Sequence, residues 1–447
     1  MRVLHVGKFY PPHPGGIERC SADLCAALSA RGIATALLAH AEPGTRRTER
    51  RDHDGIDVTL AACHGLALHT PVSPGFPWLL QETIRRFKPD LLHLHVPNPA
   101  VFSALLIPAA RKLPWIVHWH ADIPLDTRKR SLRLAYRMYR PWEQALLRRA
   151  SSVIATSQPY LDSSEALKPW RAKTAVIPLG IAPVQGAVLG VASSRSDVPP
   201  SPQPSPASGR GGKSSPASGR GGKSDSARDK GDSSPQPSAL SPAVPSWPPG
   251  KVRILAVGRL SYFKGFDVLL RALADVEEAS LLLIGDGECR GPLQQLASEL
   301  GIDARVRFAG RIDMDDKGEA EIAAAYAGAD VFCLPSTERA ESFGLVLLEA
   351  MRARLPVIAS AIPGSGVGFV VQDGRTGLMV APGDARALAT ALRRLAADSA
   401  ERDRFGSAGA ERWREHFTLD RVTDQVLELY DSVLAQHPVR AAATRAG

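Results

Sequence analysis

The chain has 447 residues, 44% of them hydrophobic and 23% charged, and a formal net charge of +9. A chain of this length exceeds what one hydrophobic core usually organises, so we expect two domains, and the composition excludes a fibrous or wholly disordered protein. No apolar run reaches the roughly 20 residues of a membrane-spanning helix, and the first residues lack a signal-peptide pattern, so we expect a cytoplasmic protein. The positive charge favours an anionic partner, whether nucleic acid, lipid headgroup or phosphorylated metabolite.

The first part of the chain alternates short β-type runs with helix-length segments. A strand over residues 2–10 leads into a loop with Gly15 and Gly16, and apolar residues at helical spacing predict a helix over 17–31. Further strands are predicted at residues 33–40, 91–96, 115–120 and 152–157. Because strands separated by helical crossovers form parallel sheets, we expect residues 1–185 to be a Rossmann-like domain.

Residues 186–249 differ from the rest of the chain. They are rich in Ser, Pro, Gly, Arg and Lys, and the decapeptide SPASGRGGKS occurs twice, at 205–214 and 215–224. Such a segment cannot build a hydrophobic core, so we expect a disordered linker. Its GGKS ends resemble a phosphate-binding loop, but Ala207 and Ala217 stand where that motif needs glycine, and no strand precedes it.

A second alternating pattern begins after the linker. Strands are predicted at residues 251–260, 280–288, 305–312, 331–336, 356–360 and 376–380, with helices over 342–353 and from 385 to about 435. We therefore assign residues 250–415 to a second Rossmann-like domain and residues 416–447 to a C-terminal helix and tail.

A cationic pair follows the first strand of this second domain. Arg259 and Lys264 lie just after the predicted strand, at the edge where open α/β sheets bind ligands. Arginine offers a planar fork of donors and lysine a compact charge, so the two could stabilise negative charge on a departing diphosphate. The alternative is a solvated surface pair.

Two carboxylates flank the start of a predicted helix. Glu341 and Glu349 are eight residues apart in ERAESFGLVLLEAM. If the helix begins near Ser342, both lie close to one face and could reach one ligand, while the backbone amides of residues 343–345 offer an anion site. The alternative is a solvated or capping pair, although an unpaired charge at Glu349 among apolar neighbours would be costly.

Several short motifs now form a recognisable set. They are Gly15-Gly16-Ile17-Glu18, Ile177-Pro178-Leu179-Gly180, Gly258-Arg259-Leu260 with Lys264-Gly265, Gly285-Asp286-Gly287, and the segment from Glu341 to Glu349. Through them the chain resembles the family-4, group 1 type glycosyltransferases of GT-B fold, over nearly everything outside the linker. The resemblance implies an α/β protein with two Rossmann-like domains whose parallel sheets face across a cleft, the first on the acceptor side and the second binding the nucleotide sugar.

The resemblance also implies roles for individual residues. Arg259 and Lys264 would contact the donor diphosphate, Glu341 the transferred sugar and Glu349 the nucleotide ribose. The loop at Gly15 and Gly16 would approach the donor phosphate and the acceptor, and Phe343, Gly344 and Leu345 would line the donor site. His120 resembles the family's active-site histidine near the sugar, with His118 as the competing candidate and a packed structural histidine as the commoner reading.

The activity implied is that of a retaining hexosyltransferase using a UDP- or GDP-sugar. Enzymes of this kind lack a dedicated carboxylate nucleophile, so positioning and leaving-group stabilisation would carry the reaction. We expect no required metal or cofactor, because Asp313-Met314-Asp315 reads as a solvated charged loop. NAD binding is not expected either, since the sixth position from Gly285 is Arg290 and the dinucleotide motif is incomplete.

The acceptor side carries a basic segment. Between residues 128 and 149, arginines and a lysine interleave with apolar residues, so a helix here could lie on an anionic bilayer or simply present a solvated face. A lipid-linked acceptor at the inner face of the cell membrane, in polysaccharide or lipopolysaccharide biosynthesis, would fit the first reading, with the protein peripheral there. A soluble acceptor is the alternative.

Two other functions would share the fold. A nucleotide-sugar epimerase or hydrolase would use the donor site without an acceptor, and a non-catalytic scaffold would bind the nucleotide sugar only. The presence of Arg259, Lys264, Glu341 and Glu349 argues against a scaffold. Nucleic-acid binding is not expected, because aromatic platforms and a known binding motif are missing from the sequence.

Overall fold

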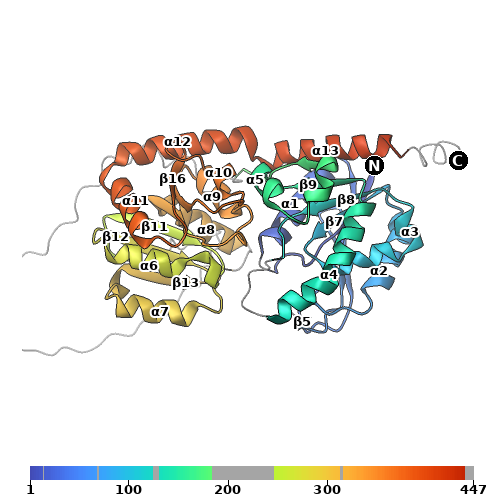
Figure 1. The fold of residues 1–447 in the computed structure, drawn as a ribbon, viewed down its shortest axis with the longest axis horizontal. Helices are drawn as coiled ribbons and strands as arrows, with labels where there is room; N and C mark the ends of the chain where they lie inside the picture. Colours follow the sequence, from blue (N-terminus) through green and yellow to red (C-terminus); the bar gives the residue numbers. More distant parts are fainter. Residues whose placement is uncertain (14, 68–69, 124–129, 184–245, 313–315, 438–447) are drawn as a thin grey trace, which may run out of the picture. The chain divides into compact units, whose positions relative to one another are not determined.

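The computed structural model describes residues 1–13, 15–67, 70–123, 130–183, 246–312 and 316–437. Most of the predicted linker, residues 186–245, and the segment Asp313-Met314-Asp315 lie outside the described residues. Residues Met1–Pro183 and Pro242–Gly447 belong to one compact unit that contains two separate sheets (Figure 1).

The first sheet has eight strands in the order β10-β9-β8-β7-β1-β2-β4-β3. Its neighbouring strands are parallel except for the β3–β4 pair. The strands are β1 (Arg2–Val6), β2 (Ala34–His40), β3 (Glu49–His53), β4 (Ile56–Ala61), β7 (Leu91–Val96), β8 (Trp115–Trp119), β9 (Ser152–Ala155) and β10 (Thr174–Val176). A separate two-stranded pair joins β5 (Leu66–Ala67) and β6 (Thr70–Pro71).

Both faces of this sheet are covered by helices, as the side-chain alternation of buried strands requires. The apolar face of Leu92, Leu94 and Val117 packs against α2 (Phe76–Phe87), α4 (Arg130–Arg149), α5 (Gln158–Ser163) and the 3-10 segment η1 (Pro99–Leu105), with α3 (Pro108–Arg111) beside them. The opposite face, with Val3 and Leu91, packs against α1 (Gly16–Ala30) and α13 (Leu419–Ala435). On this second face the register pairs His5 with His93 and His95 with His118.

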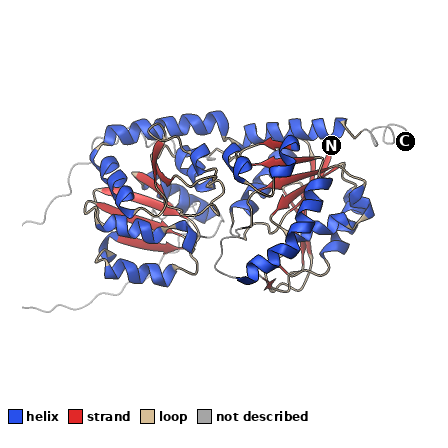
Figure 2. Cartoon of the chain, in the orientation of Figure 1, coloured by secondary structure: helices blue, strands red, loops and turns tan. Residues whose placement is uncertain are grey.

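The second sheet has six parallel strands in the order β13-β12-β11-β14-β15-β16 (Figure 2). They are β11 (Val252–Val257), β12 (Ala279–Ile284), β13 (Val306–Gly310), β14 (Val331–Leu334), β15 (Val357–Ser360) and β16 (Gly377–Val380). One face packs on α6 (Phe266–Ala274), α7 (Arg290–Glu299) and α11 (Ala385–Ala397). The other packs on α8 (Asp316–Gly328), α9 (Leu345–Arg352), α10 (Val367–Val370) and α12 (Ser399–His416).

The predicted parallel α/β architecture is confirmed, and each strand predicted from the sequence is present within a few residues. The helix expected from Ser342 begins instead at Leu345, and strands β3 and β4 were not predicted. Gly344 precedes this helix with a φ of 81°, in the left-handed region, so helical geometry cannot extend through it. The exact domain boundaries remain predictions.

Candidate active site

Lys264 and Glu341 meet at the carboxyl end of the second sheet. Strand β11 ends at Val257, and Lys264 closes the 3-10 turn that follows. The Lys264 Nζ donates a hydrogen bond to Glu341 Oε2 at 2.6 Å, and the Ser336 hydroxyl donates to the same oxygen at 2.9 Å. Because the Lys264 and Glu341 side chains are only 13% and 10% exposed, water screens this pair less than a surface ion pair.

A glycine after Lys264 allows the two loops to touch. Gly265 has a φ of 65°, and a Cβ there would lie 2.1 Å from the carbonyl oxygen of Pro335. Any side chain at 265 would therefore be strained and would collide with backbone. The Lys264-Gly265 pair in the sequence thus has a structural reason, since it brings the loop after β11 against the loop after β14 that carries Glu341.

Glu349 lies inside α9, and its side chain is nearly buried. Its Oε2 accepts a hydrogen bond from the Tyr326 hydroxyl at 2.8 Å, and its Oε1 accepts one from Arg19 at 3.1 Å. The structure therefore supplies the partners that a carboxylate in this apolar helix requires. Tyr326, from α8, and Arg19, from α1, were not identified from the sequence because nothing marks them before the helices are placed.

Glu341 and Glu349 do not share a helix. The sequence-based expectation of one helical face was wrong, because α9 begins only at Leu345 and Glu341 lies in the non-helical segment before it. Each carboxylate has its own cation, Lys264 for Glu341 and Arg19 for Glu349. The two residues can still act on different parts of one extended ligand.

Phe343, Gly344 and Leu345, between the two carboxylates, have different surroundings. Phe343 is 1% exposed and packs edge-on against Phe417, so its side chain belongs to the core. Gly344 is the N-cap of α9, and a Cβ there would lie 2.7 Å from the Leu347 side chain. The first backbone N–H groups of α9, beginning at Leu345, have no partner within the helix and are the groups that can meet an anion.

Arg259 is the most exposed member of the predicted set. Its side chain is 68% exposed, and its guanidinium lies 3.7 Å from the carboxylate of Glu288. A second cation lies near it: burial lowers the pKa of Lys8, the charge of Glu18 raises it, and the charge of Arg259 lowers it again. Lys8 was missed in the sequence, although its place two residues beyond strand β1 is the signal that would have found it.

Gly15 and Gly16 form the start of α1. A Cβ on Gly15 would lie 2.0 Å from Glu18 Oε2, so a side chain there would displace this carboxylate from its place beside the helix N-terminus. Burial raises the pKa of Glu18, with smaller opposing effects from its backbone hydrogen bond, His13 and Lys8. A Cβ on Gly16 would lie 4.0 Å from Leu345 Cδ2, so the starts of α1 and α9 are neighbours.

His120 follows β8 and is 2% exposed. Its Nε2 is 3.0 Å from His95 Nδ1, and its Nδ1 has no hydrogen-bond partner. Burial, followed by His118 and His95, lowers its pKa well below the usual value, so the imidazole is neutral. The competing candidate, His118, pairs instead with His93 at 3.2 Å.

Asp122 and Arg339 connect the segment after His120 with the segment before Glu341. The Arg339 guanidinium donates to Asp122 Oδ2 at 2.6 Å and lies 4.1 Å over the ring of Tyr160. Asp122 Oδ1 also accepts from the indole of Trp119 at 2.8 Å. This ion pair was not predicted; its signal is the carboxylate two residues after His120 in HWHADI.

Comparison with known proteins identifies the family of both halves of the chain. The family described as "Glycosyl transferases group 1" matches residues 251–398, and the "Glycosyl transferase 4-like domain" matches residues 15–180. The chain belongs to the group 1 glycosyltransferases. The two matches together cover most of the chain outside the linker and the C-terminal helices; the first contains the whole second sheet, and the second contains the first sheet except for β1.

Individual relatives of this glycosyltransferase are similar over their whole length. It is 28% identical to the O-antigen chain mannosyltransferase C of Escherichia coli, over 97% of this chain and 99% of the relative. It is 27% identical to the phosphatidyl-myo-inositol mannosyltransferase of Mycobacterium leprae, over 97% of both chains. These relatives support a glycosyltransferase that takes part in polysaccharide or lipopolysaccharide biosynthesis.

Solved structures confirm the GT-B fold of the glycosyltransferase. Sucrose-phosphate synthase from Thermosynechococcus elongatus superposes with a TM-score of 0.69 at 23% identity, covering 97% of this chain and 99% of that one. The Anabaena protein HepE in complex with UDP-glucose gives a TM-score of 0.63 at 20% identity, covering 97% and 100%. Within the described residues, no helix is both long and apolar enough to cross a membrane.

Proposed function

We propose that this glycosyltransferase moves a hexose from a UDP- or GDP-sugar to a glycan acceptor with retention of anomeric configuration. The observation that carries the proposal is the shielded Lys264–Glu341 pair at the carboxyl end of β11 and β14. This edge is where open α/β sheets bind ligands. The pair brings a cation for phosphate and an acceptor for sugar hydroxyls within one hydrogen bond of each other.

Each site residue then has a chemical task. Lys264 and Arg259 contact the diphosphate and stabilise the charge that develops when it leaves. Glu341 accepts a hydrogen bond from the transferred sugar, and Glu349 accepts one from the ribose. The starts of α9 and of α1, at Leu345 and Gly16, add backbone N–H groups beside the phosphates.

The transfer exchanges one bond at the anomeric carbon for another. The bond from C1 to the diphosphate oxygen breaks, the acceptor oxygen bonds to C1 on the same face, and the acceptor's hydroxyl proton passes to the departing diphosphate. The protein's residues orient both partners, which can supply a large part of the barrier reduction. In this proposal the lysine and arginine neutralise the diphosphate, so no metal is required.

Two comparisons support the donor class. The HepE structure contains UDP-glucose, and the E. coli and M. leprae relatives are named mannosyltransferases. A UDP-sugar and a GDP-sugar differ in the base, so the first experiment separates them.

Thermal unfolding with UDP, GDP, ADP and NAD tests the donor site. A ligand at about 100 times its dissociation constant adds roughly 2.7 kcal/mol to the free energy of unfolding. We expect a selective rise in Tm with UDP or GDP, and its loss in Arg259→Ala. No response to any of the four would contradict the proposal.

Product analysis tests the reaction itself. With the matching nucleotide sugar and a lipid-linked or soluble acceptor, we expect a new glycoside whose anomeric configuration, read from its proton NMR coupling, equals that of the donor. Inversion of configuration would refute retention, and formation of free sugar alone would favour a hydrolase.

The acceptor surface is proposed to lie on α4. Its outer side exposes Leu134, Met138 and Trp142, four residues apart, with exposed fractions of 64%, 74% and 45%. Arg133, Arg137 and Arg140 are exposed beside them. An apolar stripe flanked by arginines suits the headgroup boundary of an anionic bilayer, so we propose a lipid-linked acceptor and a peripheral position at the inner membrane face. Of the basic segment, residues 128 and 129 lie outside the described residues.

A hollow of about 390 Å³ opens next to this stripe. Trp142, Leu106 and Phe102 line its outer side, and His40 and Phe76 line its inner side. Leu106 is itself 69% exposed. The hollow is apolar enough to receive the first groups of a lipid chain, which would place the acceptor's sugar end towards the carboxyl ends of β2 and β7.

Vesicle flotation tests this surface. We expect binding to vesicles of phosphatidylcholine with phosphatidylglycerol at low salt, weak binding to phosphatidylcholine alone, and loss of binding in the double variant Leu134→Asp, Met138→Asp. Tyr262→Asp is the matched control, because Tyr262 is an exposed apolar side chain, at 56%, on the other sheet's domain. Equal binding by both variants would remove α4 from the proposal.

A further inference from the structure

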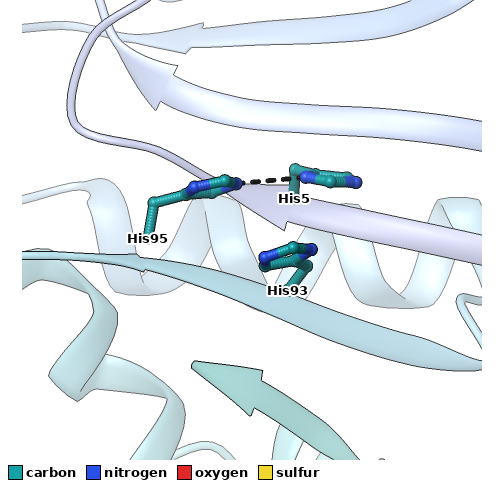
Figure 3. A group of neighbouring side chains, drawn as sticks. All are labelled: His5, His93 and His95. Atoms are coloured by element: carbon teal, nitrogen blue, oxygen red, sulfur yellow. Dashed lines mark hydrogen bonds between the residues drawn. The ribbon is translucent and has the colours of Figure 1, made fainter. Parts of the chain in front are cut away.

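Five buried histidines lie together on one face of the first sheet. They come from three adjacent strands and the residue after β8, and each is at most 2% exposed: His5, His93, His95, His118 and His120. Figure 3 shows His5 and His95 joined across neighbouring strands, with the ring of His93 beside them. Only His120 was predicted from the sequence to be a site residue, and the transfer chemistry described above gives none of the five a task, so the cluster needs a reason.

The five rings form two separate hydrogen-bonded chains. In the first, His5 Nδ1 is 3.1 Å from His95 Nε2, and His95 Nδ1 is 3.0 Å from His120 Nε2. In the second, the Tyr430 hydroxyl is 2.5 Å from His93 Nδ1, and His93 Nε2 is 3.2 Å from His118 Nδ1. The chains stack on each other but do not exchange a hydrogen bond that the structure records. Only the first reaches His120.

In a hydrogen-bonded row of neutral imidazoles, all the N–H groups donate in the same direction along the row. Each ring carries one N–H and one bare nitrogen, so all the bonds of the first chain must run the same way. Either every Nδ1 carries the hydrogen and His120 Nδ1–H points out of the chain, or every Nε2 carries it and His5 Nε2–H does. Burial keeps the rings neutral, since it lowers the pKa of each of the three.

Both ends of the chain are buried, and neither His5 Nε2 nor His120 Nδ1 has a partner among the described residues. An N–H at either end needs an acceptor, because a buried N–H without one is costlier than a buried lone pair without a donor. His120 follows β8, at the edge where open α/β sheets bind ligands, whereas His5 lies within β1. A bound ligand can supply the acceptor at His120 and not at His5, so the direction that gives His120 the Nδ1–H is favoured.

We propose that His5 and His95 are positioning residues that fix His120 in the tautomer whose Nδ1–H donates a hydrogen bond to the bound sugar donor. The proposal rests on the proposed function for the identity of that ligand. The hydrogen-bonded row of His5, His95 and His120 is observed in the structure itself. His120 then acts as a neutral hydrogen-bond donor, and not as a general base, because the lone pair of its Nε2 is already occupied by His95.

A metal centre is the other use for such a cluster. Ring nitrogens of His5, His93 and His95, and of His95, His118 and His120, lie within 4.8 Å of one another. The rings are stacked, however, with interplanar angles of 5° for His93 and His95 and 10° for His118 and His120. In-plane lone pairs on stacked rings run side by side and do not converge on one ion, so the hydrogen-bonded chain fits better.

Nitrogen NMR of histidine-labelled protein tests the tautomers without any activity. We expect His5, His95 and His120 each to show a protonated Nδ1 and a bare Nε2 at pH 7.5, and His120 to lose its single tautomer in His95→Leu. A protonated Nε2 on His120 would overturn the proposal. So would a stoichiometric zinc ion retained by the purified protein, because the metal would occupy the same nitrogens.

Kinetics with matched variants test the role in transfer. His93→Leu is the control, because His93 is equally buried on the same strand but bonds only to the second chain. We expect His95→Leu to lower kcat by about 10-fold or more with little change in donor KM, and His93→Leu to change kcat by less than about 3-fold. His95→Asn should recover most of the rate, since its amide can donate where Nδ1 did.

A double-mutant cycle separates this inference from the proposed function. If His95 acts through His120, His95→Leu should cause no further loss of kcat in a His120→Ala background. If each substitution lowered kcat by the same factor in the presence and absence of the other, the positioning role would be overturned, but the proposed transferase activity would not. A wild-type protein that neither binds a nucleotide nor forms a glycoside would instead overturn the proposed function, and the NMR result would still stand or fall on its own.

Discussion

Lys264 and Glu341 are 77 residues apart in the sequence, yet Nζ and Oε2 lie 2.6 Å apart, and the same Oε2 also accepts a hydrogen bond from the Ser336 hydroxyl. The pair is the closest ion pair among the predicted site residues that the structure describes. Because both side chains are largely buried, each holds the other's charge in place. We therefore expect the pair to contribute to stability as well as to the proposed donor binding.

Replacing Lys264 with alanine should affect both properties. The variant leaves the Glu341 carboxylate with the Ser336 hydroxyl alone, so we expect the free energy of unfolding to fall by about 1–3 kcal/mol. We also expect nucleotide-induced stabilisation to disappear. Urea unfolding with and without the nucleotide measures both changes.

Arg259→Ala is the control for this variant. Arg259 is 68% exposed, so its removal should change the free energy of unfolding by less than about 0.5 kcal/mol while still weakening the nucleotide response. If Lys264→Ala and Arg259→Ala lowered the free energy of unfolding by the same amount, the Lys264–Glu341 pair would make no special contribution to stability.

The fold was predictable from the sequence where strands are buried on both faces. Segments such as 91–96 and 115–120 read as apolar runs, and they became β7 and β8 with almost the same ends. The edge pair β3–β4 was not predicted, because the exposed Glu49–His53 is a charged segment that carries no buried-strand pattern. The two strands form a hairpin across Asp54-Gly55, both with positive φ, so this Asp-Gly turn is the local signal that would have found the pair.

The site was predictable in part. Lys264 and Glu341 were both singled out from the sequence and lie 2.6 Å apart, but Tyr326 and Arg339 come from elements that only tertiary folding brings near them. The start of α9 was misplaced because the left-handed conformation of Gly344 is a packing requirement. The histidine chain was also missed, since alternation in LHLHV indicates a strand face but not which rings meet across strands.

Acid should destabilise the protein steeply. Burial, the largest cause, lowers the pKa of His40 to about 4 and that of His95 to about 3, and it lowers those of four further histidines: His5, His93, His118 and His120. Below the unfolded value of about 6.5 the unfolded chain binds protons that the folded chain does not, so stability present above this pH is lost as pH falls. Each such histidine contributes about 1.4 kcal/mol per pH unit there.

Three carboxyls oppose this trend, because burial raises the pKa of Glu18, Asp23 and Glu143. Burial is the main cause that raises the pKa of Glu143 to about 7, so between about pH 4.5 and 7 acidification stabilises the folded form through this group. Six histidines outweigh three carboxyls, and we expect a net loss of several kcal/mol between pH 7.5 and 5.5. Urea unfolding across this range measures the slope, and a flat profile would show that the histidines are hydrated in solution.

Gly344→Ala should weaken both the fold and the donor site. Gly344 has a φ of 81°, and a Cβ would lie 2.7 Å from Leu347 Cδ1 and 3.1 Å from Leu334 Cδ2. Gly374→Ala is the matched control, because Gly374 has a φ of 70° with nothing within 4 Å. We expect the control to lose about 1 kcal/mol from backbone strain and Gly344→Ala to lose about 1–3 kcal/mol more. Urea unfolding measures both losses. If the two variants lost the same free energy of unfolding, α9 would have moved to accommodate the added Cβ at no energetic cost.

Glu349 and Tyr326 should separate ligand binding from positioning. Glu349→Gln removes the charge that is proposed to hold the ribose, so we expect nucleotide affinity to fall about 10-fold, or roughly 1.4 kcal/mol. Tyr326→Phe removes only the hydroxyl that donates to Glu349 at 2.8 Å, and Arg19 still holds the other oxygen at 3.1 Å. The carboxylate then keeps one of two partners, so we expect a smaller loss of affinity, by about 2- to 3-fold. Isothermal titration with the nucleotide measures both; a larger loss in Tyr326→Phe than in Glu349→Gln would show that the ribose is held elsewhere.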